Sequence, residues 1–173
     1  MTVRVVLDLN VFVAYALGIA AKRTTSASSY LVDSVGQGVC PLGSLQLVIS
    51  WGMLNRLQSV LIRKLGASEE RAMDFCSLIA KIAEAGAFAE SPTLTLGGAG
   101  VIALKDEEDA HVLETAIAGN ASLLVTRNFK DFLEQMQVIK RGEIGQINAS
   151  GQQIIVAQPN IAAQWFREGK ISL

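Results

Sequence analysis

Short, largely apolar segments of strand type alternate with longer segments of helix type along this chain. The first, residues 4–7, is rich in β-branched side chains and indicates a strand buried on both faces. Similar segments return at residues 46–49, 123–126 and 153–157. This alternation predicts parallel strands joined by right-handed crossover helices. We therefore expect an α/β fold, a three-layer α/β/α sandwich around a central, mostly parallel sheet.

The segments between the predicted strands carry helix start and stop signals. Ser50 is a natural N-cap, leucines follow at helical spacing, and Gly66 is a natural stop, so a helix is predicted over residues 51–65. Pro159 opens a terminal helix over residues 160–167. Further helices are expected over residues 10–17, 30–35, 68–85 and 106–118, with a short helix or turn over 129–136. Residues 137–152 are predicted to form an extended loop or hairpin, and residues 88–90 a short strand.

Length and composition limit the classes of protein that fit. The 173 residues, half of them hydrophobic, are expected to form one domain, residues 1–173, with a single core. The longest apolar stretch, residues 11–21, is too short to span a bilayer, and no targeting segment is visible, so we expect a cytoplasmic protein without membrane contact. Cys40 and Cys76 lack CxxC spacing and are expected to be free, buried thiols. A single histidine, His111, argues against a histidine-based zinc site or catalytic triad.

The charge is small but unevenly distributed. A net charge of −1 does not indicate a general nucleic-acid binder. Between Leu9 and Ser68, however, Asp33 is the one acidic residue. The basic residues of that stretch are Lys22, Arg23, Arg56, Arg63 and Lys64. An acidic pocket with a basic rim can hold a phosphate backbone at zero net charge; ordinary solvated charge is the alternative interpretation.

Acidic and polar side chains stand where the predicted strands end. Asp8 follows the first strand, residues 106–109 (Asp-Glu-Glu-Asp) open a helix, and residues 126–128 (Thr-Arg-Asn) follow another strand. The carboxyl ends of parallel strands meet at one edge of a sheet, and Mg²⁺ and Mn²⁺ prefer carboxylate oxygen. The pattern predicts a divalent-cation site with Asp8 and Asp109 as ligands, and Asp106 as the next candidate.

Helix capping is the alternative explanation for these acids. Asp8 could accept backbone N–H groups from the helix that follows it. Asp106 is well placed as an N-cap, with Asp109 as its partner at the third helical position. A carboxylate among apolar neighbours is costly to bury without a partner, and the second acidic cluster favours a cation as that partner.

Four stretches of the sequence resemble, in order, those of the PIN domain family, the metal-dependent ribonuclease fold used by VapC-type toxins. They are VVLDLNVFV, LVISWGMLNRLQSVLIRKLG, KDEEDAHVLETAIAGNASLLVTRNFKDF and IIVAQPNIAAQWF, and they span nearly the whole chain. The resemblance implies a PIN-like fold and an endoribonuclease that hydrolyses phosphodiesters with Mg²⁺ or Mn²⁺. It also implies RNA as the substrate, a cognate antitoxin protein as a partner, and a homodimer.

The family's functional residues can be carried over position by position. Asp8 matches the first metal-binding aspartate, Asp109 the later one, and Asn10 a polar residue that supports the first. Thr126 matches a strand-end hydroxyl that orients the site, while either Asn128 or Asp131 corresponds to the fourth acid. The implied catalytic residues are Asp8, Asp109, Thr126 and Asn128, and the candidate metal ligands are Asp8, Asp106, Asp109 and Asp131. Candidate contacts to an RNA backbone are Arg63, Lys64, Arg127 and Lys130, and ordinary solvent-facing charge is the alternative for each.

The third helix departs from the family pattern. Where the family has a glutamate in E-L-x-x-V-L, residues 56–61 read Arg-Leu-Gln-Ser-Val-Leu, so Arg56 takes the glutamate position. A permanent cation there would repel Mg²⁺ and could pair with Asp8 or Asp109, so we expect weakened metal binding and cleavage. The second hypothesis is a catalytically degenerate PIN domain that binds RNA or a protein. The third, a receiver-like signalling domain, should show a late strand-end lysine, and none is evident.

Overall fold

The computed structural model describes residues 2–92 and 107–173. Within these residues, the strands form one seven-stranded sheet in the order β2-β3-β1-β4-β7-β6-β5. The four central strands run parallel to one another. They are β3 (Gly43–Leu47), β1 (Thr2–Leu7), β4 (Leu123–Val125) and β7 (Gln152–Ala157). The predicted α/β fold with a mostly parallel centre is confirmed.

Antiparallel strands extend the sheet at both edges. On one side β2 (Val39–Cys40) pairs with β3, and on the other β6 (Ile144–Ala149) and β5 (Gln137–Lys140) follow β7. Of the two predictions for residues 137–152, the hairpin is confirmed. Positive φ angles at Ser150 and Gly151, 51° and 78°, fit the two-residue turn that joins β6 to β7.

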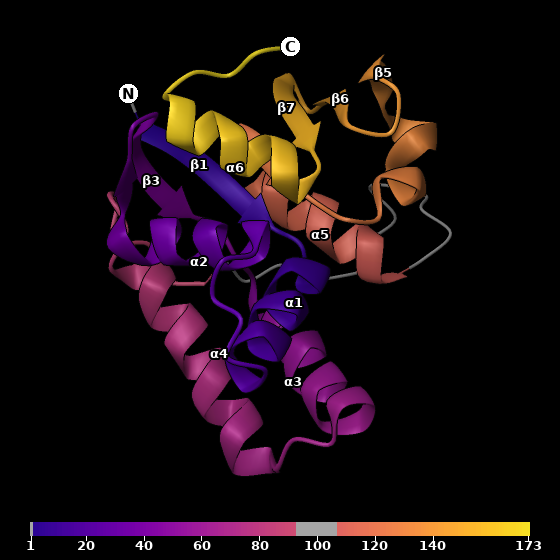
Figure 1. Cartoon of the computed structure of the whole chain (residues 1–173). Helices are drawn as coiled ribbons and strands as arrows, with labels where there is room; N and C mark the ends of the chain where they lie inside the picture. The colour runs from indigo at the N-terminus through magenta and orange to yellow at the C-terminus, as the bar shows by residue number, and fades with distance from the viewer. Residues whose placement is uncertain (1, 93–106) are drawn as a thin grey trace.

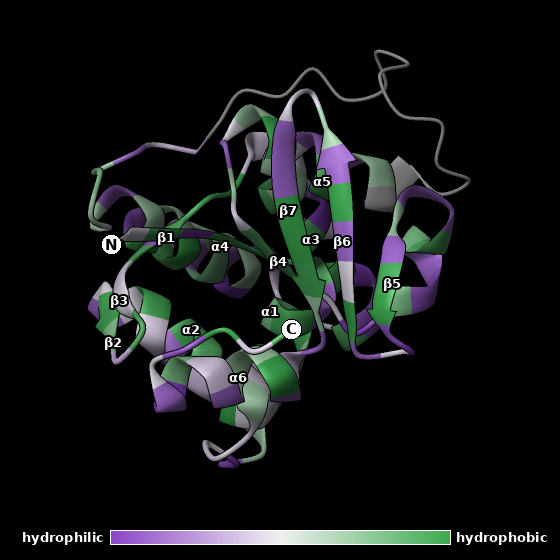
Figure 2. Ribbon diagram, turned by 90° about the horizontal axis from the view of Figure 1, so that it is seen from above, coloured by the Kyte–Doolittle hydropathy of each residue, from purple (hydrophilic) through white to green (hydrophobic). Residues whose placement is uncertain are grey.

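Helices cover both faces of the sheet. Figures 1 and 2 show α2 and α6 side by side over one face, with α5 over the opposite face. The pair α3 and α4 packs together beside α1 and projects beyond the sheet (Figure 1). The helices are α1 (Leu9–Ala20), α2 (Ala27–Gln37), α3 (Trp51–Leu65), α4 (Glu69–Glu84), α5 (Glu107–Ala118) and α6 (Pro159–Glu168), with a 3₁₀ helix, η1 (Phe129–Gln135), after β4.

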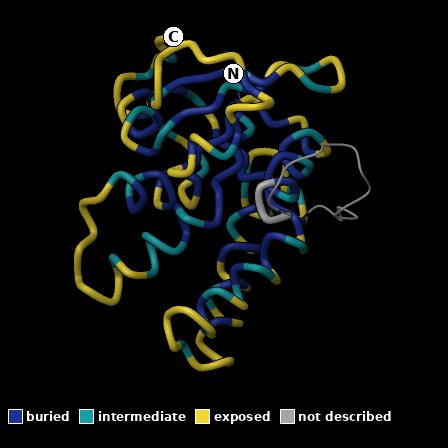
Figure 3. The backbone as a smooth tube through the Cα atoms, turned by 90° about the vertical axis from the view of Figure 1, so that its right-hand side faces the viewer, coloured by how far each residue is buried: buried dark blue, intermediate teal, exposed yellow. Residues whose placement is uncertain are grey.

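The core lies between the sheet and these helices. Strand β1 is buried on both faces along Val5–Leu7, as its apolar run predicts. Three fully buried phenylalanines, Phe12, Phe132 and Phe166, enter the core from α1, η1 and α6. Figure 3 shows the buried residues running through the middle of the molecule, with exposed residues at the far turn between α3 and α4.

Local signals fix the bounds of α3. The Ser50 hydroxyl accepts a hydrogen bond from the Met53 N–H at 3.2 Å, and Gly66 ends α3 with a φ of 67°. Both are standard capping arrangements, so the predicted bounds 51–65 agree with α3. In α6, Pro159 occupies the first turn as predicted.

The predicted strand over residues 88–90 is wrong. The Phe88 N–H donates to Oε1 of Gln46 at 2.8 Å instead of joining a strand ladder. Gln46 is fully buried in β3, and its Nε2 also donates to the carbonyls of Leu47 and Ala83 at 2.8 Å each. One amide side chain therefore ties the chain after α4 to β3.

The structure also bears on the predictions about the cysteines and about membrane-spanning segments. Both cysteines are free thiols, but Cys40 is only half-buried, whereas Cys76 is buried and its burial raises the pKa of the thiol to about 11. Across residues 2–92 and 107–173, no helix has the length and apolar character needed to cross a membrane.

Candidate functional site

Asp8 lies at the junction between β1 and α1, at the carboxyl edge of the parallel strands. Its backbone N–H donates to the Val125 carbonyl at 2.9 Å, which continues the β1–β4 pairing by one residue. Its side chain is the N-cap of α1, because Oδ1 accepts the Leu9 N–H at 2.6 Å. The capping explanation for this acid is confirmed, and it leaves Oδ2 available for other partners.

Oδ2 of Asp8 connects two segments that are distant in sequence. It accepts hydrogen bonds from Oγ1 of Thr126 and from Nδ2 of Asn10, both at 2.6 Å. Thr126 Oγ1 in turn accepts the Asn128 N–H at 2.9 Å, and Asn10 Oδ1 accepts the Arg127 N–H at 3.1 Å. The structure therefore brings together residues 8–10 and 126–128, as the strand-end pattern predicts.

Electrostatics make this carboxylate unusual. Burial raises the pKa of Asp8 above its ordinary value, and hydrogen bonds from Thr126, Leu9 and Asn10 oppose that rise without cancelling it. The negative charge of Asp131 also raises the pKa, as the smallest of these effects. Asp8, 4% exposed, forms no ion pair with any residue that the structure describes.

Two mutually repelling carboxylates, one of them desolvated, suit a hard divalent cation, which would relieve both the repulsion and the cost of burial. The described residues do not complete such a site: they contain no group of three or more His, Cys, Asp or Glu side chains that could hold a metal. Asp8 and Asp131 thus supply only part of the ligand set that a divalent cation needs.

Two of the predicted ligands cannot be placed from their side chains. Asp106 lies outside the described residues. The backbone of Asp109 lies in the first turn of α5, which packs against β1 and α3, but its side chain is outside the described residues. The ligand roles of both stay predictions.

A hollow of about 370 Å³ opens beside Asp8. It lies between α1, α3 and the loop after β4. Its charged and amide residues are Asp8, Asn10, Lys64, Arg127 and Asn128, and apolar side chains such as Val13 and Val60 complete the wall. Two cationic side chains and one carboxylate therefore line the same space, which can accept an anion such as a phosphodiester.

A second hollow, of about 610 Å³, lies on the other side of Arg127. Lys130 and Arg141 line it together with Phe129 and Leu133. Of the predicted RNA contacts, Lys64, Arg127 and Lys130 thus line these two hollows. The side chain of Arg63 is exposed in the last turn of α3 and is not among the residues that line them.

Arg141 is a residue that the sequence reasoning missed. The available signal was the adjacent basic pair of residues 140–141 in a predicted loop or hairpin. That signal does not reveal which hollow the hairpin faces.

Arg56 lies on α3 between residues that contact α5 and residues that line the hollow. Residues 52, 56, 60 and 64 recur every four positions, so each neighbours the next along the helix surface. At one end of this row, a side chain at Gly52 would meet the His111 ring of α5, with 3.3 Å between its Cβ and Nδ1. At the other end, Val60 and Lys64 line the hollow beside Asp8. Arg56 itself is half-buried.

Comparison with known families gives one match. The PIN domain family model matches residues 4–130, about three quarters of the chain. The matched range contains Asp8, Arg56, Asp109 and Asn128, and it ends one residue before Asp131. No curated protein sequence matches the chain.

Proposed function

Because the chain belongs to the PIN domain family, whose fold is of nuclease type, we propose that it is an endoribonuclease of low activity that depends on Mg²⁺ or Mn²⁺. One observation carries the proposal. The buried Asp8 carboxylate, repelled by Asp131, stands beside a hollow that also holds Lys64 and Arg127. A cation-binding acid and a phosphate-binding surface are thus adjacent, as phosphodiester hydrolysis requires.

The chain's own residues have separable tasks in this proposal. Asp8 and Asp131, with Asp109 and Asp106 as further candidates, would hold the cation, and its bound form would supply an activated water and stabilise charge on the phosphate. Asn10 and Thr126 hold the Asp8 carboxylate in a fixed orientation. Lys64 and Arg127 neutralise the RNA backbone, and Asn128 can donate to a phosphate oxygen.

Two features argue for low activity. By the resemblance to the family, Arg56 takes the position of a glutamate, and it lies on the same helix as Lys64, which lines the hollow. Asn128, which follows the strand-end threonine, is neutral. Both changes remove negative charge from a cation site, and Arg56 also adds positive charge, so the cation should bind weakly.

Cleavage of single-stranded RNA in Mg²⁺ or Mn²⁺ tests the proposal. We expect slow cleavage by the chain as it stands, none by Asp8→Asn, and a gain of about tenfold or more in Arg56→Glu, because a ligand replaces a repelling charge. The matched control is Arg71→Glu, the same charge change on an exposed part of α4. Equal, robust cleavage by the unmodified chain and by Arg56→Glu would show that Arg56 does not limit the reaction.

Metal binding has a readout that is independent of cleavage. Mn²⁺ should raise the melting temperature of the unmodified chain, and Asp8→Asn should abolish the increase. Asp74→Asn, an exposed acid on α4, is the control and should keep the full increase. An increase that survives in Asp8→Asn contradicts the assignment of Asp8 as a ligand.

A second function, RNA binding without cleavage, is favoured by the two cations that line the hollow beside a single acid. RNA retained in EDTA, together with absent cleavage by both the unmodified chain and Arg56→Glu, would support it. Loss of RNA binding in EDTA would favour the nuclease.

We also propose the toxin role, with an antitoxin partner and a homodimer, from the resemblance to VapC-type toxins. Exposed Trp51 and Met73 line a hollow of about 290 Å³ between α3 and α4 and supply apolar surface for such partners. Expression alone should slow bacterial growth, and Asp8→Asn should relieve the effect. Light scattering should give the mass of a dimer; a monomer would contradict that part.

A further inference from the structure

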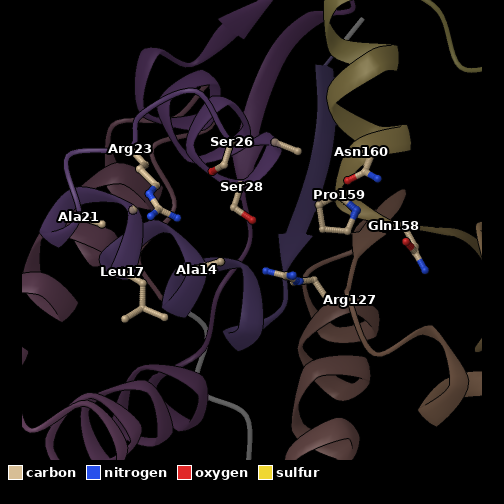
Figure 4. A pocket seen from close by; sticks show the side chains of 12 residues that line it. Ala14, Leu17, Ala21, Arg23, Ser26, Ser28, Arg127, Gln158, Pro159 and Asn160 are labelled. Atoms are coloured by element: carbon tan, nitrogen blue, oxygen red, sulfur yellow. The ribbon is translucent and has the colours of Figure 1, made fainter.

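Another hollow, of about 710 Å³, adjoins the one beside Asp8. The two share Ala14, Leu17 and Arg127, so they are neighbours along α1. This larger hollow is lined by α1, by residues 21–28, by Arg127 and by the start of α6 (Figure 4). Its volume lies within the range of about 300–1,000 Å³ that is typical of small-molecule sites.

Two arginines give this hollow its charge. Figure 4 shows Arg23 and Arg127 pointing into it from opposite sides. Neither guanidinium forms an ion pair with a residue that the structure describes, and no lining residue is acidic. Two uncompensated cations that converge on one space favour an anionic group such as a phosphate monoester or a phosphodiester.

Ser28 contributes a hydrogen-bonding group to the hollow. The residue is only 5% exposed, and its hydroxyl points into the hollow (Figure 4). Within the described residues this hydroxyl has no hydrogen-bond partner, whereas the neighbouring Ser26 and Ser29 hydroxyls are 2.9 Å apart and bond to each other. The Ser28 oxygen is accessible from the hollow, so it can bond to a ligand oxygen there.

The N-terminal ends of α2 and α6, which border the hollow, also favour an anion. Ser28 lies in the first turn of α2, and Pro159 and Asn160 lie in the first turn of α6. Gln158, the N-cap of α6, makes no side-chain capping bond, and its Nε2 donates to the Gly142 carbonyl at 2.6 Å. Pro159 has no N–H, so the N–H of Asn160 is the first one that α6 can offer an anion. In α2 the Ser26 hydroxyl already accepts the Ser29 N–H, so only the N–H groups before Ser29 lack a side-chain cap.

The remaining wall is apolar. Ala14, Leu17, Ala21 and Pro159 line the hollow beside the two arginines. An inorganic anion would leave this surface uncovered, whereas a nucleoside would cover it. The combination of a cationic end and an apolar wall matches a phosphate that carries an organic group.

We propose that this hollow binds a phosphorylated nucleotide unit, with the phosphate between Arg23 and Arg127 and hydrogen-bonded by Ser28. The nucleoside would rest on the apolar wall. Because Arg127 also lines the hollow beside Asp8, the unit would be the RNA nucleotide next to the phosphodiester at Asp8, a point that rests on the proposed function. A free nucleotide offers the same chemistry, so the probes below separate the two sources.

Binding is measured calorimetrically in EDTA, on the full chain carrying Asp8→Asn, so that cleavage plays no part. The probes are adenosine, AMP, and five-residue oligoadenylates with and without a 5′-phosphate. We expect AMP to bind more tightly than adenosine. Arg23→Gln should weaken every phosphorylated probe about tenfold, the effect of one charge-assisted hydrogen bond, and Ser28→Ala should weaken them less. Arg71→Gln is the control and should change nothing.

The outcomes separate this proposal from the nuclease. Arg23-dependent binding of both oligonucleotides identifies an internal RNA phosphate, and binding of the 5′-phosphorylated one alone identifies an RNA end. AMP bound as tightly as either oligonucleotide identifies a free nucleotide. Each of these three outcomes supports a nucleotide-binding site in this hollow, even if no RNA is cleaved. Adenosine bound as tightly as AMP, or equal affinities in Arg23→Gln and the parent chain, would overturn the proposal.

Discussion

At the scale of single residues, Asp8 joins folding to the candidate chemistry. Its carboxylate caps α1 through Oδ1 and binds Asn10 and Thr126 through Oδ2. Burial and the charge of Asp131 still raise its pKa. The folded state therefore binds a proton at Asp8 more readily than the unfolded state does, which makes stability depend on pH.

This dependence has a definite sign. The unfolded pKa is about 3.9, and the folded pKa lies above it, so Asp8 begins to reduce the free energy of unfolding as the pH rises past about 4. The reduction is complete above the folded pKa and absent below pH 3.9. Denaturant titrations without metal measure the free energy of unfolding. That of the unmodified chain, relative to that of Asp8→Asn, should be higher at pH 4 than at pH 7. A difference that does not change with pH would contradict the raised pKa.

The sequence predicted much of this residue-level arrangement. The strand-end positions of Asp8 and Thr126 were enough to place them together, because the carboxyl ends of neighbouring parallel strands share one edge. Capping and cation binding are alternatives for Asp8 in the sequence; the structure confirms the cap through Oδ1 and shows Oδ2 bonded to Asn10 and Thr126, and cation binding stays a prediction. Arg23 and Ser28 were not predicted as ligand contacts, because their partner, Arg127, is about a hundred residues away in sequence.

At the scale of elements, Gln46 holds the segment after α4 against β3. Its amide makes three hydrogen bonds in a fully buried position. Gln46→Ala should lower the free energy of unfolding by roughly 2–4 kcal/mol, because it leaves buried backbone groups without partners and opens a cavity. Urea denaturation would measure the loss, with Gln37→Ala, on the exposed end of α2, as a control expected to lie within about 0.5 kcal/mol of the unmodified chain. A loss equal to that of the control would mean that the amide does not stabilise the segment.

The elements also show what sequence periodicity leaves out. The bounds of α3 follow from Ser50 and Gly66, since both caps are local signals. Residues 88–90 have strand-like side chains, but a buried amide from β3 took the backbone N–H that a strand would have used. For residues 137–152 the sequence left an extended loop and a hairpin open, and the structure shows that they pair as β5 and β6 beside β7.

At the scale of the whole molecule, three hollows meet at Arg127. Cationic side chains line these hollows along the carboxyl edge of the sheet, although the net charge of the chain is −1. The side chains are Arg23, Lys64, Arg127, Lys130 and Arg141. A local surface, and not the total charge, therefore determines whether this protein attracts RNA.

Salt dependence measures that surface. For single-stranded RNA, the slope of log affinity against log salt should become shallower by about 0.7 for each phosphate contact removed. Arg127→Gln should give the largest change of any single substitution, because its side chain lines all three hollows. Arg71→Gln removes the same charge from α4 and should leave the slope unchanged. Equal slopes for Arg127→Gln and the unmodified chain would mean that RNA does not follow this edge.

The capping bond from Asp8 to Leu9 has an evolutionary consequence. A homologue of this chain without nuclease activity would still need an acceptor at that position to begin its first helix. Selection for a stable fold would preserve the aspartate even where no selection for catalysis acts. Asp131 makes no such capping bond in the described residues, so in a homologue of this kind it would be lost earlier than Asp8.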